Sequence, residues 1–205
     1  MEPRWLEYIK RVEAISRIGL TNCRNPYDIE RYEELRSISI QFMEHYSGEE
    51  LKKIEELFAS DPGYKTPKVE VRGVVFRDGK MLMVKELADN KWSLPGGYCE
   101  VGYSISENVV REIGEESGFK AKPVKLLAVF DRSKHAHPPS PYHVYKVFVY
   151  CEIIGETPIR GLETDGVGFF GMEDLPELSI NRILREQIEI MFGFMRDPDK
   201  VPLFD

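Results

Sequence analysis

Apolar residues recur at three- and four-residue spacing through residues 1–60, which predicts helices and a small helical domain. A first helix is expected to end at Gly19, and Asn25-Pro26 predicts the cap and first turn of a second helix that continues to Gly48. Ser47–Glu50 has the capping-box pattern that would open a short third helix. Three helices in so short a stretch bury little surface, so we expect them to pack on a second domain or on another subunit.

The pattern changes after residue 60. Residues 61–67 contain two prolines and a glycine and are predicted to be a linker. From residue 68 to residue 76 apolar and polar positions alternate, which predicts a strand, and Arg77–Lys80 is a hairpin signal. The second domain, residues 68–205, should therefore mix helices and strands, and the whole chain is predicted to be of the α+β class. Its further expected elements are strands at 122–131, 143–154 and 167–170, and helices at 104–117 and 181–195.

Composition narrows the class of protein. The chain has 205 residues and a net charge of −7, which disfavours a general affinity for polyanionic nucleic acid. It contains no apolar run near the roughly 20 residues of a membrane-spanning helix, and its first residues lack the pattern of a signal peptide. Cys23, Cys99 and Cys151 form no CxxC pair, which argues against a disulfide framework and a zinc site. We expect a cytoplasmic protein.

The chemically informative segment is the helix predicted between Gly102 and Gly118. Glu112, Glu115 and Glu116 stand at positions i, i+3 and i+4, so their carboxylates share one face and repel one another. A cation should compensate, and oxygen ligands without histidine or cysteine favour Mg²⁺ or Mn²⁺. The alternative is an ordinary solvated face, which is the commoner explanation of a glutamate-rich helix.

The residues that flank this helix favour the metal site over the solvated face. The segment Trp92–Gly97 reads WSLPGG, and eight positions from Gly97 to Phe119 match a known signature. In this respect the chain resembles the Nudix hydrolases. The resemblance covers about residues 67–205 and implies an α/β/α sandwich with a mixed sheet that uses Mg²⁺ or Mn²⁺ to hydrolyse phosphoanhydride bonds. The matching positions are Gly97, Arg111, Glu112, Ile113, Glu115, Glu116, Gly118 and Phe119.

The resemblance also implies a set of metal ligands. Glu112 and Glu116 would be the first ligands, helped by Glu115 and by the backbone carbonyl of Gly96. One position departs from the signature, because Tyr103 stands where a glutamate is expected and a neutral phenol is a poor Mg²⁺ ligand. The number of metal ions therefore stays open.

The catalytic assignments come from the same resemblance. Arg111 would orient the carboxylates, and the general base would be either Glu115 or Glu163, a residue of a loop late in the domain. Glu163 could equally be a charge on an ordinary loop.

Four further residues are assigned to substrate binding: Arg72, Trp92, His135 and His137. The two histidines lie in a proline-rich loop that could contact phosphate or a substrate head group, with a plain surface loop as the alternative. Trp92 could stack on a base, and a place in the core is the competing interpretation.

The resemblance extends to a bacterial subgroup in which a helical domain precedes the Nudix domain. It implies a small nucleotide substrate, a nucleoside diphosphate linked to a second group, with CDP-choline first, giving CMP and phosphocholine, and ADP-ribose second. A homodimer is expected. Two rival hypotheses are a non-catalytic domain that senses a nucleotide ligand and an RNA-directed nuclease. The second would use a local basic group formed by Lys120, Lys122, Lys125 and Lys146.

Overall fold

The computed structural model describes residues 4–47, 66–156 and 164–205. The chain forms two compact units, Met1–Pro67 with Pro139–His143, and Lys68–Pro138 with Val144–Asp205. Among the described helices, none is both long enough and apolar enough to cross a membrane.

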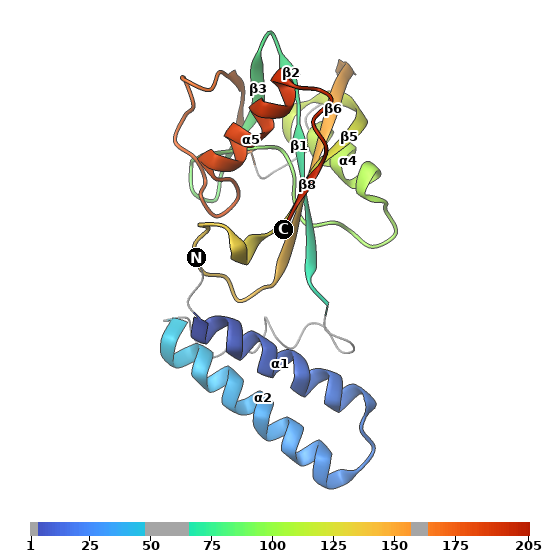
Figure 1. Ribbon diagram of the computed structural model, residues 1–205, viewed down its shortest axis with the longest axis vertical. Coiled ribbons are helices and arrows are strands. Elements are labelled where there is room, and N and C mark those ends of the chain that lie inside the picture. The colour runs from blue at the N-terminus through green and yellow to red at the C-terminus, as the bar shows by residue number, and fades with distance from the viewer. Residues whose placement is uncertain (1–3, 48–65, 157–163) are drawn as a thin grey trace. The chain divides into compact units, whose positions relative to one another are not determined.

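The first unit contains two helices, α1 (Arg4–Asn22) and α2 (Pro26–Ser47), that pack against each other (Figure 1). Their contact buries Leu6, Ile40 and Met43. Asn25 caps the second helix, because its side-chain oxygen accepts a hydrogen bond from the Tyr27 backbone N–H at 3.0 Å. The predicted third helix falls outside the described residues.

Gly19 does not end the first helix as predicted, since α1 continues to Asn22. A Cβ atom at Gly19 would lie 2.5 Å from the ring of Tyr32 on α2. The glycine is therefore needed for the close approach of the two helices, and its effect on helix propensity is overridden by this packing.

The second unit is built on two β-sheets. In the first, the order is β1-β6-β5-β8, and it is a mixed sheet because β1 pairs with β6 in parallel and β5 pairs with β6 antiparallel. Its strands are β1 (Lys68–Val74), β6 (Val144–Glu156), β5 (Phe119–Asp131) and β8 (Leu203–Phe204).

The second sheet is antiparallel and is centred on β3, which pairs with the other three strands. The hairpin predicted at Arg77–Lys80 is confirmed, with Asp78 and Gly79 both at positive φ. The single strand predicted at 68–76 is wrong in one respect: it breaks at Val75, where the chain leaves the first sheet for the second. The strands are β2 (Phe76–Arg77), β3 (Lys80–Glu86), β4 (Trp92–Ser93) and β7 (Thr164–Phe170).

Two helices cover separate hydrophobic cores of this unit (Figure 1). The helix α4 (Ile105–Ser117) packs Val109 and Ile113 into one core, and α5 (Arg185–Arg196) packs Ile188 and Met191 into the other. A short 3-10 turn, η1 (Arg132–Lys134), leads into the histidine-containing loop. The predicted fold class, helices followed by a mixed-sheet α/β domain, is confirmed.

Candidate active site

Both ends of α4 are fixed by local hydrogen bonds. The Ser104 hydroxyl accepts from the Glu107 backbone N–H at 3.2 Å, and the Glu107 carboxylate accepts from the Ser104 backbone N–H at 2.8 Å, which completes a capping box. At the other end Gly118 adopts the left-handed conformation, with φ of 73°. These caps, together with the buried apolar face, set the rotation of the helix and so the direction of its glutamates.

The turn before this helix is held against β1. Backbone N–H groups of Gly73 and Val71 donate to the carbonyls of Pro95 and Gly97, at 2.8 and 2.9 Å, and these two carbonyls flank that of Gly96. Gly96 has a φ of 144°, and a Cβ atom there would lie 2.0 Å from the Val71 carbonyl oxygen. Only glycine fits this position.

Two carboxylates of α4 meet this turn. Glu116 is 5% exposed, and its Oε2 accepts a hydrogen bond from the Gly96 backbone N–H at 2.9 Å. A Cβ atom at Gly97 would lie 3.2 Å from Oε1 of Glu112, so the absence of a side chain at Gly97 leaves room for that carboxylate. The resemblance to the Nudix hydrolases had implied that Gly96 and these two glutamates belong to one site.

The surroundings of Glu116 disfavour its ionised form. Burial raises its pKa to about 8, and the nearby carboxylates of Glu86 and Glu112 act in the same direction, while Arg72 and the Gly96 N–H oppose them. A bound cation would stabilise the ionised form of this group.

The described residues hold no ready-made cluster of three or more histidine, cysteine, aspartate or glutamate side chains around a cation position. The helix instead presents a pair of carboxylates, Glu112 and Glu116, beside the turn that carries the backbone carbonyl of Gly96. An oxygen-only donor pair with one buried carboxylate fits a hard divalent cation.

Glu115 and Arg111 lie together at the edge of this pair. The Glu115 carboxylate is 44% exposed and lies 3.7 Å from Nε of Arg111, and Glu112 lies 3.8 Å from Nη2 of the same arginine. Glu163 lies outside the described residues. Its sequence neighbour Thr164 donates a hydrogen bond from Oγ1 to the Glu116 backbone carbonyl at 3.1 Å.

Arg72 is buried in a network of protein contacts. Its Nε donates to Glu70 at 2.6 Å and its Nη1 donates to the Leu94 carbonyl at 2.9 Å, just before the glycine turn. Glu70 also accepts from Nζ of Lys146 at 2.6 Å. Burial alone would raise the pKa of Glu70, but Arg72 and Lys146 lower it to about 2.

Sequence reasoning missed the Glu70–Arg72–Lys146 network. The alternation in β1 indicates a strand with one polar face toward solvent, whereas Glu70 and Arg72 are 7% and 3% exposed. No local sequence signal indicates this network, because Glu70 and Lys146 come together only through the parallel register of β1 and β6.

Two of the predicted substrate-binding residues make contacts inside the protein. Trp92 packs its ring edge-to-face on Phe170, with centroids 4.8 Å apart. His135 lies 3.2 Å from an Asp205 carboxylate oxygen and beside the ring of Phe130. Their roles toward a substrate stay predictions.

His137 is 5% exposed, and its Nδ1 lies 2.7 Å from the Ile180 carbonyl oxygen. Because a carbonyl only accepts, Nδ1 carries the proton. Burial lowers the pKa of His137 to about 4, so the ring is neutral near pH 7. A neutral ring with Nε2 as an acceptor suits a hydroxyl or N–H donor better than a phosphate oxygen.

The basic group considered for an RNA substrate does not form as expected. Lys146 is fully buried against Glu70, and Nζ of Lys125 donates to the Pro198 and Lys200 carbonyls at 2.6 and 2.8 Å. Lys120 and Lys122 are exposed. Two of the four lysines are thus hydrogen-bonded within the protein, and two are exposed.

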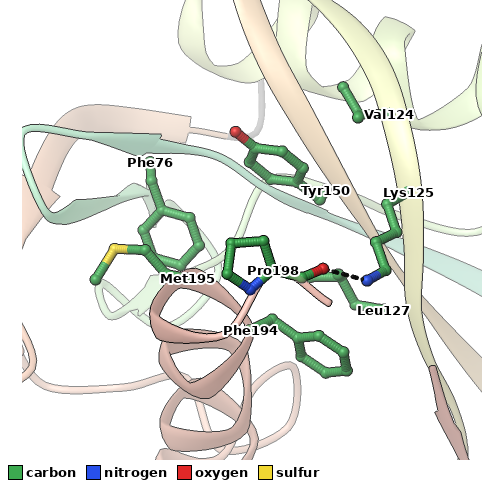
Figure 2. Close-up of a pocket in the computed structure, with 8 residues that line it drawn as sticks. All are labelled: Phe76, Val124, Lys125, Leu127, Tyr150, Phe194, Met195 and Pro198. Atoms are coloured by element: carbon green, nitrogen blue, oxygen red, sulfur yellow. Dashed lines mark hydrogen bonds between the residues drawn. The ribbon is translucent and has the colours of Figure 1, made fainter. Parts of the chain in front are cut away.

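An apolar cavity of about 260 Å³ lies between β5, β6 and the end of α5 (Figure 2). None of the predicted site residues lines it. Its lining residues are Phe76, Val124, Lys125, Leu127, Tyr150, Phe194, Met195 and Pro198.

Comparison with known proteins identifies the two parts of the chain. Residues 66–189 match the model of the NUDIX domain. The chain belongs to the Nudix family. Residues 3–58 match the UDP-X-like, N-terminal oligomerisation domain, which gives the helical unit of this Nudix protein a counterpart in known families. The predicted class, a Nudix hydrolase, is confirmed.

Several relatives resemble the chain closely. YjhB of Bacillus subtilis, provisionally named an ADP-ribose pyrophosphatase, is 46% identical over 100% of this chain and 99% of the relative. A solved UDP-X diphosphatase is 34% identical over 98% of both chains, with a TM-score of 0.64. An ADP-ribose pyrophosphatase from Streptococcus suis is 36% identical, covers 68% of this chain and 100% of its own, and has a TM-score of 0.63. These names fall in the enzyme class expected from the sequence.

Proposed function

We propose that this Nudix hydrolase cleaves the phosphoanhydride bond of a nucleoside diphosphate linked to a second group, with Mg²⁺ or Mn²⁺ as its cofactor. The observation that carries the proposal is the placement of Glu112 and buried Glu116 against the Gly96–Gly97 turn. When bound, the cation would stabilise the negative charge of the phosphate oxygens in the transition state.

The roles of the other residues follow from their contacts. Arg111 orients the Glu112 and Glu115 carboxylates, which lie within 4 Å of its guanidinium group. Glu115 is exposed enough to reach water, so it is the first candidate to take the proton of the attacking water. Glu163, which lies outside the described residues, is the second candidate from the Nudix resemblance.

We place ADP-ribose first among substrates, since a full-length relative and a solved relative carry that name. Its hydrolysis would give AMP and ribose 5-phosphate. A UDP-linked compound comes second, supported by the match to the UDP-X diphosphatase along almost the whole chain. CDP-choline, placed first from the sequence, has no support from these names and moves to third.

The test is a substrate panel with the purified full-length chain and Mg²⁺. It contains ADP-ribose, UDP-glucose, CDP-choline and a short RNA, with phosphatase-coupled phosphate release as the readout. We expect turnover of a nucleoside diphosphate compound, and a loss of at least about a hundredfold in Glu116→Gln because a metal ligand is removed. Glu177→Gln, which removes an exposed ion pair with Lys91, is the matched control.

Two outcomes would replace the proposal. Cleavage of RNA alone would favour the nuclease hypothesis despite the burial of Lys146. No cleavage with either Mg²⁺ or Mn²⁺, together with saturable binding of ADP-ribose, would favour the ligand-sensing hypothesis.

We also propose that the chain is a homodimer assembled through its helical unit, which matches an oligomerisation domain. In support, α1 and α2 expose large apolar side chains, as a surface that is covered in an assembly would do. Light scattering should give twice the 23.7 kDa chain mass. A single-chain mass at micromolar concentration would contradict this. The exposed residues are Tyr8, Ile15, Tyr27, Leu35 and Ile38.

A cytoplasmic location is proposed from the absence of a cysteine pairing pattern in the sequence. Fluorescence microscopy of a tagged full-length chain would test it.

A further inference from the structure

The segment Glu100–Tyr103 departs from the Nudix signature, which places a glutamate where this chain has Tyr103. In the structure these four residues form a turn, closed by the Tyr103 N–H and the Glu100 carbonyl at 3.4 Å. Gly102, the third residue of the turn, has a φ of 94°, a conformation that favours glycine. The first and last side chains of the turn therefore lie close together.

Both of those side chains contact Arg111. The Glu100 carboxylate accepts a hydrogen bond from Nη1 of Arg111 at 2.7 Å. The ring centroid of Tyr103 lies 5.0 Å from the guanidinium carbon, within the range of a cation–π contact. The residue at the signature position thus contributes a ring, and a residue three positions earlier contributes the carboxylate.

We propose that Glu100 replaces the missing signature glutamate as a positioning residue for Arg111, while Tyr103 supports the guanidinium group from its face. The inference rests on the proposed function, because it concerns the same metal-binding carboxylates. It explains how the site can keep an ordered Arg111 without the expected glutamate at position 103.

The distances around Arg111 show what this positioning would achieve. Its contact with Glu100 is a hydrogen bond, whereas Glu112 and Glu115 lie 3.8 and 3.7 Å from its nitrogen atoms, beyond hydrogen-bond length. Glu100 thus holds the guanidinium group near the helix carboxylates without a direct bond to them. Without Glu100, Arg111 would close on Glu112 or Glu115 and compete with a cation for their oxygen atoms.

A purely structural role predicts a different result. The Glu100 side chain is 60% exposed, and exposed ion pairs contribute little to the free energy of unfolding. Removing its charge should leave the thermal unfolding temperature nearly unchanged. The effect should appear in metal binding and in kcat.

The experiment moves the carboxylate between the two positions. Glu100→Gln and the double variant Glu100→Gln/Tyr103→Glu are compared with the unaltered chain. Mn²⁺ binding is measured by the electron paramagnetic resonance signal of the free ion, and kcat and KM are measured with ADP-ribose. Glu100→Gln should weaken Mn²⁺ binding and lower kcat about tenfold, the usual cost of losing a group that orients a metal ligand, with little change in KM. The double variant should recover to within about threefold of the original values.

Glu177→Gln serves as the matched control, since Glu177 also forms an exposed 2.7 Å ion pair, with Lys91. It should leave Mn²⁺ binding and kcat unchanged. Unchanged Mn²⁺ binding in Glu100→Gln would overturn the inference, and so would a double variant no better than the single one. If the unaltered chain hydrolyses nothing in the panel, the proposed function fails, and the Mn²⁺ measurements still decide the role of Glu100.

Discussion

Two arginines lie near the glutamates of α4, Arg72 near Glu116 and Arg111 near Glu112, and they differ in almost every physical respect. Arg72 is 3% exposed and is bound to Glu70, to the Ser93 hydroxyl and to the Leu94 carbonyl. The Arg111 side chain is 25% exposed, and its hydrogen bond goes to an exposed glutamate.

The contrast between Arg72 and Arg111 separates an effect on the free energy of unfolding from an effect on catalysis. Removing one partner of a buried ion pair lowers the free energy of unfolding by several kcal/mol, because the remaining charge stays buried without a partner and without water. A cation at the surface is solvated whether or not its partner is present. Arg72 should therefore matter first to folding and to the position of the glycine turn, and Arg111 should matter first to the carboxylates proposed to bind metal.

The largest expected effect comes from Arg72→Met. It removes the donor to the Leu94 carbonyl and leaves Glu70 with Lys146 alone, so the free energy of unfolding should fall by about 3–5 kcal/mol. Arg72→Lys keeps the charge but loses the paired hydrogen bonds. Its free energy of unfolding should therefore lie between that of the unaltered protein and that of Arg72→Met. Urea denaturation followed by circular dichroism measures both. A loss below about 1 kcal/mol in Arg72→Met would remove the distinction between the two arginines.

The free energy of unfolding should also depend on pH through the buried side chain of His137. Its pKa is lowered from 6.5 to about 4 in the folded protein, so between these values the unfolded state binds more protons. His137 should then contribute a decrease on the order of 3 kcal/mol to the free energy of unfolding as the pH falls from 6.5 to 4. Glu116, whose pKa is raised to about 8, contributes in the opposite direction down to about pH 4.5, so the His137 contribution is read from the difference between the variant and the unaltered protein.

His137→Gln should remove most of this pH-dependent loss, which urea denaturation at pH 6.5 and pH 4.5 would detect. An equal slope in the variant and in the unaltered protein would assign the acid sensitivity to other groups.

The smallest effect on stability is expected from Arg111→Met, below about 1 kcal/mol. Its kcat should nevertheless fall by about ten- to a hundredfold, because the metal-side carboxylates lose their orienting partner. Steady-state kinetics and urea denaturation of the same preparation test both parts. A large loss of stability with unchanged kcat would reverse the comparison.

Much of the candidate site was predictable because it depends on local sequence. Helical spacing places Glu112 and Glu116 on one face, and the glycines at 96, 97 and 118 mark a tight turn and a helix end. These properties follow from backbone sterics and helix periodicity, which act over a few residues.

Other features depend on contacts between distant segments. The break at Val75, the packing role of Gly19 and the burial of Glu70 and Lys146 follow from which surfaces meet, and no local pattern encodes that. The same limit applies to Glu100, because its contact with Arg111 joins a turn to a helix eleven residues further along the chain.

The sequence by itself therefore determined the family, the fold class and the carboxylates that should bind metal. The tertiary structure decided which charged residues are buried. It placed Arg72 inside the protein and Arg111 at its edge, and it gave Arg111 a carboxylate partner in Glu100 while Tyr103 contacts it through its ring. The physical reason is that the strength of an interaction between charges depends on their solvation, and only the packed structure determines where water is excluded.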